Sequence, residues 1–135
     1  MAKKERKRLF TFTVPIYYDV TKRKRVMVGM NWVTSAHYRI YSKVKKHYAD
    51  LVMSIVNNKF FFKGRVEVIY DIYLKRKNAD GGNVLAVMSK FVLDGLVKSG
   101  VIDDDKVSIV VKETGNYYLD NINPRCEITI KKSKQ

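Results

Sequence analysis

Cysteine, histidine and proline are nearly absent from this sequence, and each absence excludes a class of protein. The single cysteine, Cys126, has no partner for an internal disulfide, and with only two histidines the chain cannot assemble a Cys/His zinc site. Two prolines and seven glycines leave no room for a Pro- or Gly-rich linker. Any metal that the protein binds is therefore expected to be held by oxygen atoms.

Long apolar runs are also missing. No stretch approaches the roughly 18 apolar residues of a transmembrane helix, and the basic start "MAKKERKR" is followed by the strand-like "LFTFTVPIYY" rather than by a signal-peptide core. We expect a cytoplasmic protein. With 135 residues the chain has the length of one domain. We expect disorder only in its lysine-rich ends, residues 1–8 and 131–135.

Acidic residues are scarce beside basic ones, with 13 Asp and Glu against 27 Lys and Arg and a formal net charge of +14. Such a charge attracts polyanions, so nucleic acid is the first partner to expect. The basic residues are spread over the whole sequence, and no membrane partner is expected. The cations expected to contact nucleic acid are Arg23, Lys24, Lys43, Lys45, Lys46, Lys75, Arg76 and Lys77. For Lys43, Lys45 and Lys46 a solvated helix face is the alternative.

Hydrophobic periodicity predicts one clear strand and two helices. Alternation of apolar and polar side chains over residues 65–75 predicts a strand with one buried face. Apolar spacings of three and four predict an amphipathic helix over residues 34–57, with Thr34 or Ser35 as N-cap. A second helix is predicted from Asn83, acting as N-cap, to Lys98, with Gly100 at its C-terminal stop.

The remaining segments predict shorter elements. "LFTFTVPIYYDV" indicates an edge strand or a strand broken near Pro15, "DVTKRKR" a basic loop and "VMVGMNW" a short return strand. Near the C-terminus, "KVSIVVKE" and "RCEITIKK" predict strands separated by "TGNYYLDNINP". The expected fold class is α/β, a small single domain with a mixed β-sheet packed against two main helices.

The few acids are concentrated in one segment. Residues 78–107 hold five of the thirteen, namely Asp80, Asp94, Asp103, Asp104 and Asp105. An i,i+4 ion pair with Lys90 explains Asp94, and turn formation is the plain alternative for the other four. If instead the two ends of the second helix meet, their carboxylates repel one another and DNA unless a divalent cation neutralises them. An acid cluster surrounded by Lys and Arg is typical of metal-assisted phosphodiester hydrolysis.

The run "DGGN…SKFVLDGLVKSGVIDDD" resembles the RusA family of Holliday junction resolvases, which phages and prophages often encode. The family has an Asp-x-Asp-Asn at the helix start, then a lysine, an "LDALVKAG"-like segment and a closing Asp-Asp. In this sequence Asp80 matches the first aspartate and Asn83 the asparagine. Lys90, four residues before Asp94, matches the lysine, and Asp104 and Asp105 fall at the closing pair. The first part of the chain matches the family only in general layout.

The resemblance implies a single RusA-like nuclease domain over residues 1–135. It implies a Mg²⁺- or Mn²⁺-dependent endodeoxyribonuclease that resolves four-way junctions in recombination or replication as a homodimer, in the host cytoplasm if a phage encodes it. The residues implied as catalytic are Asp80, Lys90, Asp104 and Asp105. The three aspartates would hold the metal, with Asp105 ranked ahead of Asp104, and Lys90 would stabilise charge on the scissile phosphate. Asn83 and Asp103 would support these ligands.

One position departs from the family pattern. Gly82 stands where the family has its second aspartate, so one metal ligand is missing. Asp103, Asp104, Asp71 or water could take its place. The alternative is a basic DNA- or RNA-binding module with a degenerate active site, whose acids serve only turns.

A small RNA-binding protein is a third interpretation of the charge. Phe60, Phe61 and Phe62 could stack on bases. Burial of this trio at the start of a strand is the favoured interpretation.

Overall fold

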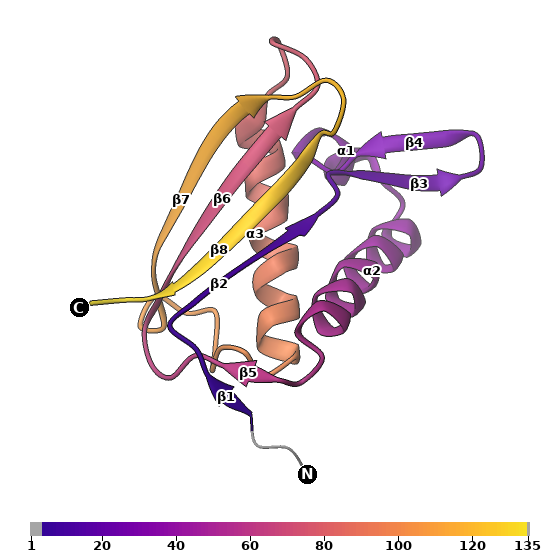
Figure 1. Ribbon diagram of the computed structural model, residues 1–135. Helices are drawn as coiled ribbons and strands as arrows, with labels where there is room; N and C mark the ends of the chain where they lie inside the picture. Colours follow the sequence, from indigo (N-terminus) through magenta and orange to yellow (C-terminus); the bar gives the residue numbers. More distant parts are fainter. Residues whose placement is uncertain (1–3, 135) are drawn as a thin grey trace.

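A computed structural model describes residues 4–134, which form one small domain of mixed α/β content and confirm the expected fold class (Figure 1). Three helices and eight strands occur within these residues. The strands are β1 (Glu5–Arg6), β2 (Leu9–Val14), β3 (Tyr17–Thr21), β4 (Lys24–Met27), β5 (Phe60–Phe61), β6 (Val66–Leu74), β7 (Val110–Leu119) and β8 (Arg125–Lys132). The helices are α1 (Met30–Ser35), α2 (Tyr38–Val56) and α3 (Gly81–Lys98).

The main sheet has four strands in the order β2-β8-β6-β7. β8 pairs antiparallel with both β2 and β6, whereas β6 and β7 are parallel. A parallel pair requires a crossover, and α3 provides it. β6 alternates buried and partly buried residues without a break along its nine residues, as its sequence pattern predicts for a central strand with one covered face.

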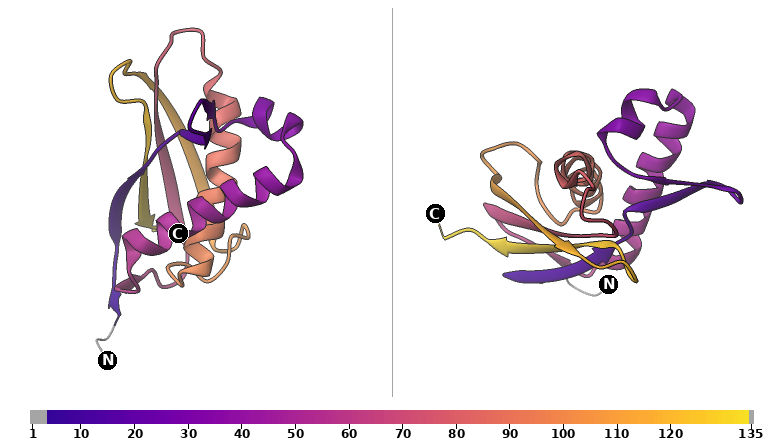
Figure 2. Two further views of the ribbon diagram at one scale, coloured as in Figure 1. Left: turned by 90° about the vertical axis from the view of Figure 1, so that its right-hand side faces the viewer. Right: turned by 90° about the horizontal axis from the view of Figure 1, so that it is seen from above.

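Both long helices lie on one face of this sheet, and no helix within residues 4–134 covers the opposite face (Figure 2). The core between the layers includes Tyr48 and Val52 of α2, Phe91 of α3 and Tyr70 of β6, all fully buried. α2 and α3 approach closely at Gly95, where an added Cβ would come within 2.9 Å of the Val52 Cβ. Glycine at this position therefore sets the spacing of the two helices.

The entrance of the chain folds as a hairpin rather than as the predicted basic loop. β2 is an edge strand that stops at Val14, and the chain breaks at Pro15 as expected. β3 and β4 then pair antiparallel, and the basic residues of "DVTKRKR" lie on this ribbon and its turn. The return strand ends at Met27, because Met30 already begins α1.

Two helix boundaries differ from the prediction for a local reason. The Thr34 and Ser35 hydroxyls donate back to carbonyls of α1, so they end that helix, and His37 caps α2 by accepting from the Arg39 N–H. The N-cap of α3 is Asp80 and not Asn83. Its predicted stop is confirmed, since Gly100 has a φ of +74° that favours glycine.

Of the last two strands, β8 agrees with the prediction and β7 agrees only in part. β8 occupies the predicted segment. β7 includes only residues 110–113 of its predicted segment, because the N–H groups of Ile109 and Val110 both donate to the Lys106 carbonyl and hold residues 106–109 in a turn. The strand instead continues to Leu119, through residues that were predicted as a loop.

The chain ends are more ordered than predicted within the described residues. Glu5–Arg6 pair with β5, and Lys131 and Lys132 belong to β8; residues 1–3 and 135 lie outside the described part. Phe60 and Phe62 are buried, which confirms the favoured interpretation for two of the three phenylalanines. None of the helices within residues 4–134 combines the length and apolarity needed to cross a membrane.

Candidate metal and nucleic-acid site

Asp80 is held at the first turn of α3 by two hydrogen bonds to one residue. Its Oδ1 accepts from the Asn83 backbone N–H at 3.3 Å, and its Oδ2 accepts from the Asn83 side-chain amide at 2.8 Å. The carboxylate is exposed and lies at the N-terminus of the helix. Asn83 therefore orients Asp80, as the sequence predicts, although Asp80 itself is the cap.

The two glycines that follow Asp80 have different surroundings. A Cβ on Gly81 would come within 2.3 Å of the Tyr117 ring, so packing against β7 demands glycine there. A Cβ on Gly82 would meet only the Asp80 Oδ1, at 3.5 Å. Position 82 is thus open, and a carboxylate there would lie beside Asp80.

The closing acids lie at the other end of α3. Asp103 and Asp105 are exposed in the loop after the helix, and the Asp104 Oδ1 accepts from the Asp105 N–H at 2.7 Å. Buried Val101 and Ile102 fix this loop to the core. An α-helix of 18 residues is about 27 Å long, so Asp80 cannot share one metal ion with Asp104 or Asp105 of the same protomer. The two ends of α3 therefore do not meet within a single chain.

Lys90 and Asp94 do not form the predicted pair. Asp94 forms its ion pair with Lys98, at 3.2 Å. Lys90 lies over the Tyr41 ring of α2, with 5.8 Å from its Nζ to the centroid. Ten residues separate it from Asp80, or about 15 Å along the helix axis. Lys90 therefore does not lie beside Asp80, where the predicted catalytic role would need it.

Asp71, considered as a substitute ligand, lies on the uncovered face of the sheet. Its Oδ1 accepts from the Asn116 side-chain amide at 3.0 Å. Asp80 lies at the end of the sheet where α3 begins. Asp71 and Asp80 therefore do not belong to one group of carboxylates. Among residues 4–134 no group of three or more His, Cys, Asp or Glu side chains is placed to hold a metal ion.

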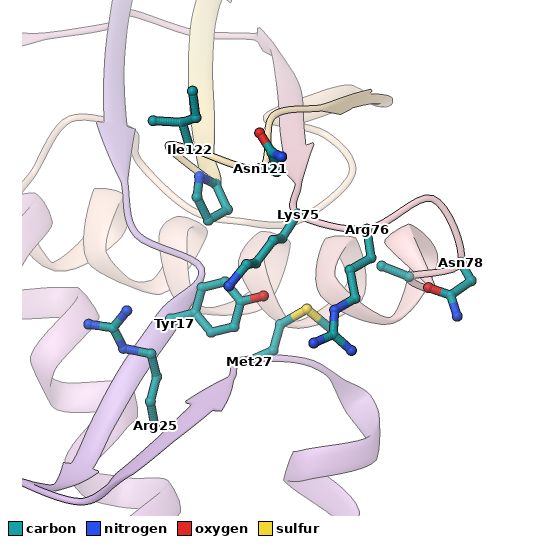
Figure 3. Close-up of a pocket in the computed structure, with 10 residues that line it drawn as sticks. Tyr17, Arg25, Met27, Lys75, Arg76, Asn78, Asn121 and Ile122 are labelled. Atoms are coloured by element: carbon teal, nitrogen blue, oxygen red, sulfur yellow. The ribbon is translucent and has the colours of Figure 1, made fainter.

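A basic cleft lies at the end of the sheet where α3 begins, and its lining includes Asn78 and Ala79, which directly precede Asp80 in the chain (Figure 3). Its volume is about 560 Å³. Three segments line it, the β3–β4 hairpin, the chain after β6 and the loop between β7 and β8. The lining residues are Tyr17, Arg25, Met27, Lys75, Arg76, Asn78, Ala79, Asn121, Ile122 and Pro124.

The cleft contains two of the eight predicted DNA contacts, Lys75 and Arg76. Lys77 lines a neighbouring hollow of about 320 Å³ with Tyr117 and Tyr118. Arg23 and Lys24 are exposed at the tip of the hairpin that forms one wall. The α2 group is separate from these, and there Lys46 already forms an ion pair with Asp50 at 3.0 Å.

Sequence reasoning missed the other cleft residues, because the β3–β4 hairpin that carries Tyr17 and Arg25 is far in the chain from the loop that carries Ile122. The loop that carries Ile122 is stabilised by Asp120, which accepts from the Ile122 and Asn123 N–H groups at 3.0 Å and from Arg125 at 2.9 Å. These hydrogen bonds lower the pKa of Asp120, with the backbone N–H of Asn123 as the largest cause. The Asp-x-x-Asn turn pattern at 120–123 was the available signal.

β7 forms one edge of the main sheet along ten residues. It runs from the end of the domain that carries Asp103, Asp104 and Asp105 to the end that carries Asp80 (Figure 1). Tyr117, Tyr118 and Leu119 on it are each about half exposed. An exposed edge of this length can pair with another strand.

Comparison with known proteins gives no family for this chain: neither a protein-family model nor a curated protein matches it.

Proposed function

We propose that this protein is a metal-dependent, structure-selective endodeoxyribonuclease of the RusA type that acts on branched DNA as a homodimer. One observation carries the proposal. Asp80, Asp103, Asp104 and Asp105 flank α3, and none of them forms an ion pair within residues 4–134, although the chain has 27 basic residues. Unpaired carboxylates in so basic a chain are suited to a cation bound from solution.

Carboxylate oxygens are suitable ligands for Mg²⁺ or Mn²⁺. Within one protomer, however, these carboxylates lie too far apart to bind the same ion. A site that uses both ends of α3 must therefore combine two protomers. β7 runs alongside α3 between the two groups of acids, and antiparallel pairing of β7 with its copy would reverse one protomer relative to the other. Residues 103–105 of one protomer would then lie at the end that carries Asp80 of its partner. A two-fold dimer has two such sites.

The roles of the residues follow from this arrangement. Asp80, held by Asn83, and Asp105 or Asp104 of the second protomer would hold the ion. A bound Mg²⁺ would lower the pKa of its water and polarise the phosphate. Lys75 and Arg76 lie in the cleft beside Asp80 and would bind the phosphates next to the cut. Lys90 lies between the two ends of α3, where it can reach DNA that spans both protomers.

Cleavage of a labelled four-way junction tests the proposal. We expect paired nicks in the junction with Mg²⁺, none with EDTA and none in a linear duplex of the same sequence. Asp80→Asn and Asp105→Asn should each abolish cleavage and leave junction binding intact. Cleavage by both variants would show that these residues are not the ligands.

A junction-binding protein without catalysis is the second candidate, and the metal geometry favours it. The described part of a single protomer has no group of three metal-binding side chains, and Gly82 removes a ligand that the family pattern includes. Under this alternative the protein binds branched DNA with and without Mg²⁺ and cuts neither substrate. Titration with Mn²⁺ separates the candidates, because only the nuclease has a saturable site that depends on Asp80 and Asp105.

A further inference from the structure

We propose that the basic cleft beside Asp80 holds one unpaired nucleotide of a DNA branch point, and that Ile122 acts as a wedge at its rim. This inference rests on the DNA-binding part of the proposed function and does not depend on cleavage. It assigns a role to Tyr17, Met27 and Ile122, which the phosphate-binding cations leave unexplained.

The lining of the cleft combines the two kinds of group that a nucleotide needs. Tyr17 and Met27 form an apolar wall from the β3–β4 hairpin, and Pro124 adds to it from the opposite loop. Bases stack on tyrosine rings whatever their identity. The volume of about 560 Å³ lies in the range of small-ligand pockets. A duplex would not fit such a cleft, whereas a single base would.

The charges of the cleft favour phosphate on either side of that base. Arg25, Lys75 and Arg76 line it, and no carboxylate is among its lining residues. Figure 3 shows the Lys75 and Arg76 side chains reaching from the end of β6 toward Tyr17 and Met27. Arg25 uses its Nε for Asp19, at 2.9 Å, and no bond of its other two nitrogens occurs among the described residues. The guanidinium therefore retains donors for a phosphate.

Ile122 is exposed to 91% on a loop whose shape is fixed. Asp120 accepts from the Ile122 and Asn123 N–H groups and from Arg125. The loop is therefore already ordered and loses little conformational freedom when Ile122 contacts DNA. An isoleucine this exposed contributes little to the core. Apolar side chains that enter a base step unstack it and open the duplex. At a branch point, where stacking is already interrupted, this costs less.

Binding in EDTA tests the inference, with fluorescence anisotropy of two short DNA duplexes, one fully paired and one with a single unpaired nucleotide. We expect the wild-type protein to bind the bulged duplex about tenfold more tightly. Ile122→Ala and Tyr17→Ala should each remove most of this preference and leave affinity for the paired duplex within about twofold. Leu9→Ala, which removes an exposed apolar side chain from β2, is the matched control and should keep the preference.

Equal wild-type affinity for the two duplexes would overturn the inference, as would a preference that survives in both variants. Tighter binding of bulged RNA than of bulged DNA would overturn the assignment to DNA. The result is separable from the nuclease proposal. If the protein prefers the bulged duplex but does not cut the junction, the nucleotide-binding role of the cleft stands and the nuclease proposal fails. If it cuts the junction without preferring the bulged duplex, the nuclease proposal stands and the role of the cleft fails.

Discussion

Gly81 begins α3 directly over Tyr117 of β7, so close that a Cβ on this glycine would come within 2.3 Å of the tyrosine ring. This contact joins the helix that carries Asp80 to the strand proposed to pair with a second protomer. We expect Gly81→Ala to lower the free energy of unfolding by about 1–3 kcal/mol, the usual cost of overpacking. Chemical denaturation of the variant measures it.

Two further variants make that experiment specific. Gly82→Ala places the same methyl group one residue later, where it meets only the Asp80 Oδ1 at 3.5 Å, and should not destabilise the fold. In a Tyr117→Ala background, Gly81→Ala should no longer be destabilising. An unchanged cost in that background would show that the ring is not the cause.

Gly82→Asp should create a stronger metal site. The new carboxylate would lie beside Asp80, and its charge is also favoured in the first turn of a helix. We expect Mn²⁺ affinity, measured by calorimetry, to rise about tenfold or more because ligand charge sets affinity. Gly82→Asn has the same size without the charge and should leave affinity near wild type. Equal effects of the two substitutions would contradict the role assigned to this position.

Lys75→Ala and Arg76→Ala should each weaken DNA binding and reduce its dependence on salt. Removing one cation–phosphate interaction lowers the slope of log K against log salt concentration by about 0.9 for duplex DNA. Lys46→Ala removes the same charge from α2, where Asp50 already neutralises it, and should change the slope less. Three equal slopes would mean that net charge alone, and not the cleft, binds the DNA.

The loop that carries Ile122 should become less stable in acid. The pKa of Asp120 lies below its ordinary value of 3.8 in the folded protein, so this residue stabilises the fold above that pH and ceases to do so as pH falls through its folded pKa. Asp120→Asn should therefore destabilise the protein at pH 7, and the difference from wild type should shrink below pH 3.8. Thermal unfolding across this range checks the sign; a difference that is constant with pH would contradict it.

The parts of the fold that depend on local pattern could be predicted from the sequence. β6 and β8 follow from alternation and from flanking turns, and the end of α3 follows from Gly100. The second half of β7 was missed because its helix-facing positions include Gly115, which packs under Leu85 and interrupts the apolar pattern. A contact between α3 and the sheet, not a local preference, keeps this segment extended.

The candidate site also has a part that could be predicted from the sequence and a part that could not. The acids and Asn83 could be found from spacing, but the sequence did not show that the full length of α3 separates Asp80 from Asp105 within one chain. The cleft could not be predicted, because Tyr17, Arg76 and Ile122 are brought together only by the packing of the hairpin and two loops at one end of the sheet.

Mixing two inactive variants tests most directly whether the catalytic site combines two protomers. Asp80→Asn and Asp105→Asn are each expected to be inactive as homodimers. After unfolding and refolding together in equal amounts, each mixed dimer should contain one intact site, formed by Asp80 of one protomer and Asp105 of the other. We predict nicking of a four-way junction at about one quarter of the wild-type rate, on one strand and without the paired second cut. No activity in the mixture, from variants shown to exchange subunits, would contradict the shared site.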